Sequence, residues 1–150
     1  MIEEHNVYLG LGANIGDRKQ AIRQAIEQIE ELIGTVVSQS ALYETQPWGF
    51  TSPHPFINAC ICCRTALSPQ QVLRITQGIE KKMGRTAKTH NGVYQDRLID
   101  IDILLYDDLQ LNTPTLTIPH PMMHERDFVM IPLREILETE FPTPFCSKND

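Results

Sequence analysis

The sequence has no apolar run long enough to cross a membrane and no N-terminal stretch typical of a signal peptide. We therefore expect a soluble, cytoplasmic protein without a membrane partner. The net charge of −6 at pH 7 argues against nucleic acid as the main partner. The four cysteines do not form the two C-x-x-C pairs of a zinc site, so we expect them to be buried and reduced.

The familiar phosphate-binding motifs are also missing. The segment Gly10-Leu11-Gly12-Ala13-Asn14-Ile15 lacks the last glycine of the dinucleotide fingerprint, and neither a G-x-x-x-x-G-K-[ST] loop nor the protein-kinase signatures are present. If ATP binds, a metal ion, arginines and other polar side chains must therefore hold its phosphates. Positive charge does gather in the middle of this acidic chain, which suits a small polyanion. The candidate phosphate ligands are Arg85, Lys88, Arg97, His120 and Arg126.

With 150 residues, 41% of them hydrophobic, the chain is predicted to form one domain over residues 1–150. Asp17 can cap a first helix that ends at Gly34, a suitable C′ residue, and Ser68 with Gln71 forms a capping box for a second helix. The other expected elements are strands from Val7 to Gly12, Thr35 to Tyr43, Phe56 to Thr65 and Arg97 to Tyr106.

This order of strand, helix, strand, strand, helix, strand predicts an α+β fold with a ferredoxin-like βαββαβ core. Two helices then cover one face of a mainly antiparallel sheet. Beyond the last of these strands we expect a hairpin around Asp107 and Asp108 that leads to Leu111. The remaining tail is rich in proline and is predicted to contain one short helix, from Met130 to Leu137.

Two aspartates, Asp100 and Asp102, lie one residue apart in an otherwise apolar run. In a strand, alternate side chains point to the same face, so the two carboxylates would stand about 6–7 Å apart. Side by side in an apolar setting they would repel each other unless a cation lay between them. Magnesium takes oxygen ligands from one or two carboxylates and completes its shell with water and phosphates. The alternative is a strand edge that carries two solvated aspartates.

Several motifs together resemble the 6-hydroxymethyl-7,8-dihydropterin pyrophosphokinase family. They are Gly12-Ala13-Asn14-Ile15-Gly16-Asp17, Tyr43-Glu44-Thr45, Phe56-Ile57-Asn58-Ala59, Asp96-Arg97-Leu98-Ile99-Asp100-Ile101-Asp102-Ile103-Leu104 and Leu116-Thr117-Ile118-Pro119-His120-Pro121. The resemblance extends from about Val7 to Leu137. It implies that pyrophosphate moves from ATP to the hydroxymethyl group of the pterin, with release of AMP, in folate biosynthesis. It implies a protein that binds ATP and a pterin, and we expect a monomer.

The resemblance also implies a role for individual residues. Asp100 and Asp102 would hold two magnesium ions, and the catalytic residues Arg85 and Arg97 would stabilise charge on the phosphates. ATP would contact Gln77, Glu80, Lys88, Ile103, Thr117, His120 and Arg126. The pterin would stack between Phe56 and Phe128, with Thr45, Gln46, Trp48, Asn58 and Tyr94 completing its site. A flat polar heterocycle needs two aromatic faces and an edge of donors and acceptors, which fits this set.

The sequence departs from the family pattern between residues 85 and 97. Many members have more arginines and a tryptophan there, whereas this chain offers Lys88 and Tyr94 at altered spacing. Two other functions remain open at this point. A dihydroneopterin aldolase would also bind a pterin, but it needs neither metal nor ATP, so the aspartate pair argues against it. A noncatalytic nucleotide-binding regulator with a ferredoxin-like fold would not account for Phe56, Phe128 and Asn58.

Overall fold

The computed structural model describes residues 3–45, 55–84 and 98–140. Along the chain its elements are β1 (His5–Ala13), α1 (Arg18–Leu32), β2 (Thr35–Gln39), β3 (Tyr43–Thr45), β4 (Phe56–Thr65), α2 (Pro69–Lys82), β5 (Asp100–Tyr106), β6 (Leu111–Asn112), β7 (Thr117–Ile118), a short 3-10 helix (Met123–Glu125) and α3 (Asp127–Glu140). None of the helices in these ranges is long and apolar enough to span a membrane.

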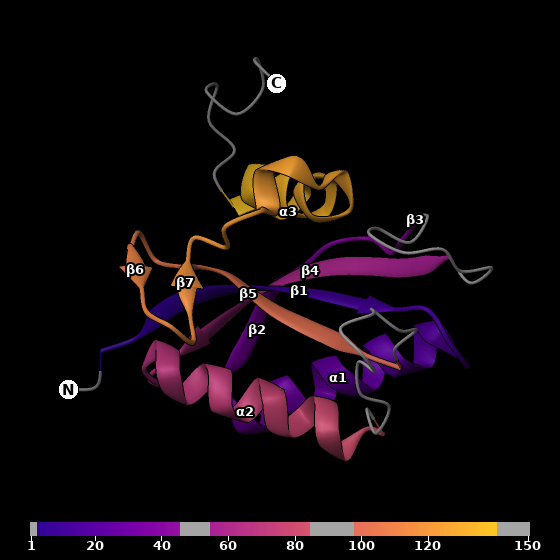
Figure 1. Cartoon of the computed structure of the whole chain (residues 1–150), viewed down its shortest axis with the longest axis horizontal. Helices are drawn as coiled ribbons and strands as arrows, with labels where there is room; N and C mark the ends of the chain where they lie inside the picture. Colours follow the sequence, from indigo (N-terminus) through magenta and orange to yellow (C-terminus); the bar gives the residue numbers. More distant parts are fainter. Residues whose placement is uncertain (1–2, 46–54, 85–97, 141–150) are drawn as a thin grey trace.

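The main sheet has the strand order β2-β4-β1-β5, with β3 also paired to β4, and every pairing is antiparallel. This is the order expected of a ferredoxin-like βαββαβ core, so the fold prediction is confirmed. Figure 1 shows α1 and α2 together on one side of the sheet and α3 on the other. The sequence predicted the first helical layer but not the second.

Alternating side chains divide the core into two layers. Ile101 and Ile103 of β5, with Leu9 and Leu11 of β1, belong to the layer beneath α1 and α2. On the opposite face a second cluster packs against α3; its buried members are Tyr8, Cys60, Cys62, Leu104, Met123, Val129, Leu133 and Ile136. Cys60, Cys62 and Cys63 are buried free thiols, and burial, with a smaller effect of the Glu30 charge, raises the pKa of Cys63 to about 12. The expectation of buried, reduced cysteines holds for these three residues.

The helix starts follow the predicted capping chemistry. Asp17 accepts a hydrogen bond from the Gln20 amide at 3.1 Å, and Ser68 and Gln71 form the reciprocal capping box. Gly34 is a glycine for a different reason from the one expected. It does not adopt a positive φ; instead, a Cβ at this position would lie 2.0 Å from the carbonyl oxygen of Arg64. Close approach of β4 therefore requires glycine here.

The strand expected from Thr35 to Tyr43 is divided into β2 and β3, which pair with successive parts of β4. Ser40 makes the division. Its amide donates to the Cys60 carbonyl, while its hydroxyl accepts from the Cys60 amide at 2.9 Å in place of a backbone carbonyl. A side chain thus replaces one step of the backbone ladder, and the chain changes direction before β3.

The region after β5 also differs from the prediction. The chain turns after Tyr106, where the Leu109 amide donates to its carbonyl, but β6 pairs with β7 and not with β5. The final helix is longer than expected and begins at Asp127, although Pro132 lies within it. The short expected helix, Met130 to Leu137, forms only its central part. The apolar face that packs on the sheet stabilises the additional turns.

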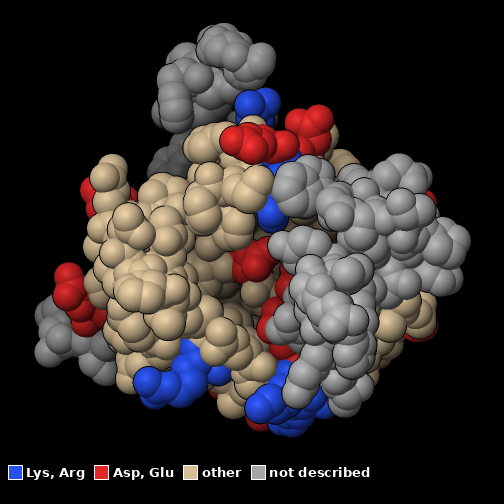
Figure 2. All heavy atoms as spheres, viewed as in Figure 1, with Lys and Arg blue, Asp and Glu red and all other residues tan. Residues whose placement is uncertain are grey.

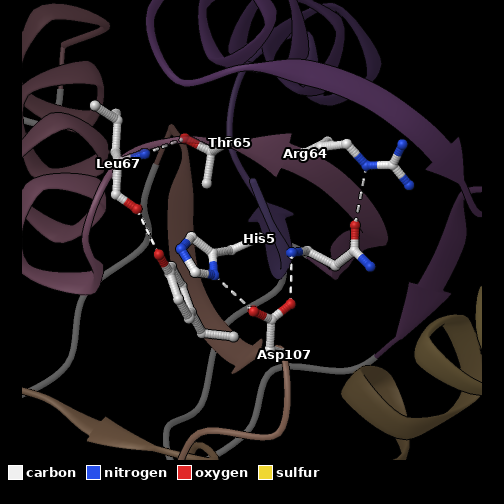
Figure 3. A network of polar contacts seen from close by, with 7 residues as sticks. His5, Arg64, Thr65, Leu67 and Asp107 are labelled. Carbon is white, nitrogen blue, oxygen red and sulfur yellow. Dashed lines mark hydrogen bonds and ion pairs between the residues drawn. The ribbon is translucent and has the colours of Figure 1, made fainter. Parts of the chain in front are cut away.

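A polar network closes the end of the sheet where β1 begins and β5 ends (Figure 3). Asp107, at φ 51°, accepts from the Asn6 amide at 2.8 Å and contacts His5 Nδ1 at 2.7 Å. The His5 ring stacks on Tyr106, whose hydroxyl donates to the Leu67 carbonyl at 2.5 Å. These contacts join β1, β5 and the segment before α2. The opposite end of the sheet, where β1 ends and β5 begins, carries the candidate site.

Candidate active site

Two glycines of the central strand β1, Gly10 and Gly12, lie on the α3-facing side of the sheet. Gly12 pairs with Asn58 of β4 on one side and with Asp100 of β5 on the other. Gly10 likewise lies between Cys60 and Asp102. Neighbouring strands are about 4.8 Å apart, so the Cα atoms of Asn58 and Asp100 are separated by about 10 Å. An amide and a carboxylate therefore lie on either side of Gly12, a strand position with no side chain of its own.

The side chains around Gly12 pack closely over it. A Cβ on Gly12 would lie 3.0 Å from Asn58 Oδ1 and 3.4 Å from Phe56 Cδ1. Asn58 is buried and Phe56 is half-buried. The predicted pterin ligands Phe56 and Asn58 thus lie together over the end of β1, and only glycine leaves room for them.

The predicted metal ligands Asp100 and Asp102 lie on the same face of β5, both half-buried, while Ile101 is buried on the other face. The predicted alternation of side chains is therefore confirmed. Among the described residues no cluster of three or more His, Cys, Asp or Glu side chains could enclose a metal. Two half-buried carboxylates on one face fit magnesium, which binds through one or two carboxylates and takes substrate phosphates as further ligands. Acidic atoms are visible inside a hollow in the space-filling view (Figure 2).

Glu80 reaches β5 from α2. Its side chain is almost fully buried, and its Oε2 accepts a hydrogen bond of 2.7 Å from the Ile101 amide. Ile101 lies between the two aspartates, and β5 is the last strand of the main sheet. Glu80 therefore holds the backbone that carries the carboxylate pair. Because backbone groups alternate in direction along a strand, the peptide groups of Ile103, predicted to contact ATP, face the same edge of β5 as the Ile101 amide, away from β1.

His120 is fixed beside this edge by its own backbone and ring. Its amide donates to the Leu104 carbonyl at 3.0 Å, and its Nδ1 lies 3.3 Å from the Met122 amide, which donates to it. Burial and then the Arg126 charge lower the pKa of His120, while Asp100 opposes the shift. The ring is therefore neutral at pH 7. Because Nδ1 accepts, the proton is on Nε2, which is then a donor.

Arg126 and Phe128 lie at the start of α3. The Arg126 guanidinium carbon is 5.6 Å from the centroid of the Phe128 ring, and Nη2 lies 3.7 Å from the sulfur of Met122. Phe128 is half-buried against the α3 layer of the core. A cation and an aromatic face are thus available together on the side of the sheet that carries Asp100 and Asp102.

The remaining predicted residues have varied positions. Gln77 is exposed on α2, and Thr117 of β7 is half-buried, with its hydroxyl 3.4 Å from Asn112 Oδ1. Thr45 pairs with Phe56 in the sheet. The predictions for Gln46, Trp48, Arg85, Lys88, Tyr94 and Arg97 fall outside the described residues.

Sequence reasoning took Gly12 as the end of a strand and as part of a family motif, but it missed the packing of Asn58 and Phe56 against it. The signal was present in the sequence: a glycine inside a strand often marks a site that another group approaches closely. It also missed Tyr43 and Glu135, which contact each other near Asn58. These two residues are 92 positions apart, so no local pattern joins them.

Comparison with known proteins identifies the family. Residues 8–138 match the family model for 7,8-dihydro-6-hydroxymethylpterin-pyrophosphokinase (HPPK). A relative from Porphyromonas gingivalis, called 2-amino-4-hydroxy-6-hydroxymethyldihydropteridine pyrophosphokinase, is 49% identical over 92% of this chain and 97% of its own length. A Bacillus subtilis protein of the same name is 40% identical over 87% of this chain and 77% of its own.

A crystal structure of Plasmodium falciparum HPPK-DHPS with pteroate shares the fold. The TM-score is 0.70 at 16% identity, over 91% of this chain and 39% of that one. The prediction made from the sequence motifs is confirmed, and the aldolase and the noncatalytic regulator are set aside. The chain belongs to the HPPK family, whose enzymes transfer pyrophosphate from ATP to 6-hydroxymethyl-7,8-dihydropterin in folate biosynthesis.

Proposed function

We propose that the reaction takes place on the α3-facing side of the sheet, across β1 at Gly12. The pterin binds at the Asn58 end and the ATP phosphates bind at the Asp100 end. The observation that carries this proposal is the register that sets Asn58, Gly12 and Asp100 side by side on three strands. The hydroxymethyl group and the transferred phosphorus can then meet on this face beside Gly12, which adds no side chain of its own between the two ends.

For the phosphates, we infer that Asp100 and Asp102 hold two magnesium ions. When bound, the metal neutralises charge on the phosphate oxygens and orients the phosphate chain. Glu80 supports this role, since its bond to the Ile101 amide fixes the strand between the two ligands. The cations predicted to stabilise the phosphates, Arg85, Lys88 and Arg97, lie outside the described residues and remain predictions.

For the rest of ATP, the open edge of β5 is the natural contact. Peptide groups at Ile103 can pair with the adenine edge, and the neutral His120 ring can donate from Nε2 to a phosphate or ribose oxygen. Arg126 can supply a permanent positive charge on the same side. Gln77 and Thr117 are the remaining proposed contacts.

For the pterin, we infer that Phe56 and Phe128 supply the two aromatic faces and that Asn58 bonds the amide edge of the ring. The close contact of Asn58 and Phe56 with Gly12 supports this, because it holds both side chains, the amide that bonds the ring edge and one of the two aromatic rings, at fixed positions. Thr45, Gln46, Trp48 and Tyr94 would complete the site. A ring held on both faces and along one edge has little freedom, so its hydroxymethyl oxygen is oriented for attack.

Transfer requires no covalent intermediate with the protein. The hydroxymethyl oxygen attacks the β-phosphorus of ATP and gives up its proton to solvent. The bond between that phosphorus and the oxygen bridging to the α-phosphorus breaks, and AMP leaves with that oxygen. Positioning and electrostatic stabilisation of the phosphates then account for the rate. A monomer and a cytoplasmic location remain expectations that rest on the sequence alone.

The test separates the two ends of the site. With ATP, magnesium and the hydroxymethyl dihydropterin, the enzyme should form AMP and not ADP. Asn58→Ala should raise the KM for the pterin by about tenfold, the effect of about 1.4 kcal/mol, and leave the KM for ATP unchanged. Asn6→Ala, at the far end of the same sheet, is the matched control. An unchanged pterin KM in Asn58→Ala would contradict the proposed site.

A further inference from the structure

We propose that Tyr43 and Glu135 are positioning residues for the pterin. They join β3 to α3 and so fix the sheet side of the pterin site, with Phe56 and Asn58, relative to Phe128 on α3. This inference rests on the site proposed above. Neither residue belongs to the sets assigned to ATP, metal or pterin contact.

The Glu135 carboxylate accepts the hydrogen bonds that join α3 to the β3 segment. The Tyr43 hydroxyl donates to Glu135 Oε1 at 2.6 Å, and the Ala41 amide donates to Oε1 at 3.1 Å and to Oε2 at 3.2 Å. The hydrogen bond to Glu135 is the main reason why the pKa of Tyr43 is raised, with smaller effects from burial and the carboxylate charge. Tyr43 therefore remains a protonated donor, and the carboxylate binds both the start of β3 and the residues just before it.

On the sheet, Tyr43 belongs to the same row as the proposed site. It pairs directly with Asn58, and residues directly opposite each other in an antiparallel pair share a face. The row across four strands is therefore Tyr43, Asn58, Gly12 and Asp100. Two residues further along β3, Thr45 pairs with Phe56. The position of β3 therefore affects the positions of Asn58 and Phe56, the two proposed pterin ligands of β4.

On the helix, Glu135 lies seven residues after Phe128. Seven residues make two turns, so the two side chains lie on the same side of α3 about 10 Å apart. Val129, Leu133 and Ile136 bury the helix against the sheet, but apolar contacts have no preferred direction. Hydrogen bonds to one carboxylate are directional, so they set the rotation and height of α3 and hence the position of Phe128.

The strand itself needs this support. Within the described part of the chain, β3 has three residues and pairs with β4 alone, and the ladder is interrupted just before it at Ser40. A strand this short is held weakly by its own backbone bonds. Glu135 supplies the additional bonds from the other layer of the fold.

The experiment measures the KM for the pterin, the KM for ATP, kcat and the melting temperature of the full chain. Tyr43→Phe keeps the ring and removes one hydrogen bond, so it should raise the pterin KM by roughly five- to tenfold while the KM for ATP changes less than about twofold. Glu135→Ala should raise the pterin KM further, and Glu135→Gln, which retains an acceptor oxygen, should recover part of the loss. In a double-mutant cycle, Tyr43→Phe should have little effect when Glu135 is already alanine.

The matched control is Tyr106→Phe. It removes another tyrosine hydrogen bond, to the Leu67 carbonyl at the far end of the sheet. A purely structural role predicts the same pattern in both variants: a lower melting temperature and an unchanged pterin KM. That result for Tyr43→Phe would overturn the proposal.

Asn58→Ala separates this proposal from the proposed site. If Asn58→Ala raises the pterin KM and Tyr43→Phe does not, only the positioning role fails. If neither variant changes the pterin KM, the proposed site fails as well. Tyr43→Phe is the decisive variant if Glu135→Ala does not fold.

Discussion

Replacing Gly12 with alanine tests the arrangement of the site most directly. The added methyl group would lie 3.0 Å from Asn58 Oδ1 and 3.4 Å from Phe56, so these side chains must move by a few tenths of an ångström. Both are proposed pterin ligands, and both would be displaced towards the space that the ring should occupy. The change is small in volume and leaves the strand's backbone conformation allowed, since no positive φ is involved.

The expected magnitude follows from the packing. Adding a methyl group to a well-packed site typically costs about 1–3 kcal/mol. If the strain falls on the pterin complex, the dissociation constant for the pterin should rise about 5- to 150-fold, since about 1.4 kcal/mol corresponds to a factor of ten. The measurement is an equilibrium titration with the pterin in the presence of a nonhydrolysable ATP analogue. This avoids equating KM with affinity.

Gly10→Ala is the matched control for this change. Gly10 lies on the same face of β1 two residues away, and its added Cβ would meet only the Leu104 side chain, at 3.4 Å or more. Its pterin affinity should stay within about twofold of the unmodified enzyme, a change of under about 0.5 kcal/mol. Equal pterin affinity in Gly10→Ala and Gly12→Ala would refute the placement of the pterin beside Gly12.

Three further predictions address the metal ligands, the aromatic pair and the histidine. Asp100→Asn or Asp102→Asn should abolish AMP formation, a loss of several kcal/mol of transition-state stabilisation, while circular dichroism shows an intact fold; near-normal turnover at saturating magnesium would contradict the two-metal assignment. Phe56→Ala or Phe128→Ala should weaken pterin binding by about 1–3 kcal/mol with little change in kcat, and a calorimetric titration that finds unchanged affinity would exclude stacking there. Folding lowers the pKa of His120, so the unfolded chain binds a proton on this residue more readily than the folded chain does. The stability that the neutral His120 ring contributes is therefore present above about pH 6.5 and is lost as the pH falls below it. Denaturation of wild type and His120→Asn should therefore converge in stability from pH 7 to pH 5, whereas a constant difference would count against a neutral ring.

Much of the fold was predictable because the signals are local. Asp17 and Ser68 mark helix starts through bonds to amides three residues away, and alternation within β5 places Asp100 and Asp102 on one face. The family motifs are short segments of the same kind. Local chemistry also fixes the order of strands and helices, and that order leaves few ways to form the sheet.

The prediction failed where a distant segment decides the local structure. Gly34 looks like a helix cap in sequence, but the nearby Arg64 carbonyl is what requires it. The strand expected to continue to Tyr43 is interrupted because Ser40 bonds to Cys60, twenty residues later. In each case the competing contact comes from β4, which the periodicity of the local segment does not contain.

The sequence by itself determined the starts of α1 and α2, the shared face of the aspartate pair and the short motifs that mark the family, since each depends on residues within a few positions of one another. Only the tertiary structure decided which distant residues lie together. Asn58 and Asp100 lie on either side of Gly12, and the Tyr43 hydroxyl donates to Glu135. Strand register depends on backbone pairing and on the burial of one face over the whole sheet. A contact across 92 residues therefore exists only after the sheet and α3 have packed together.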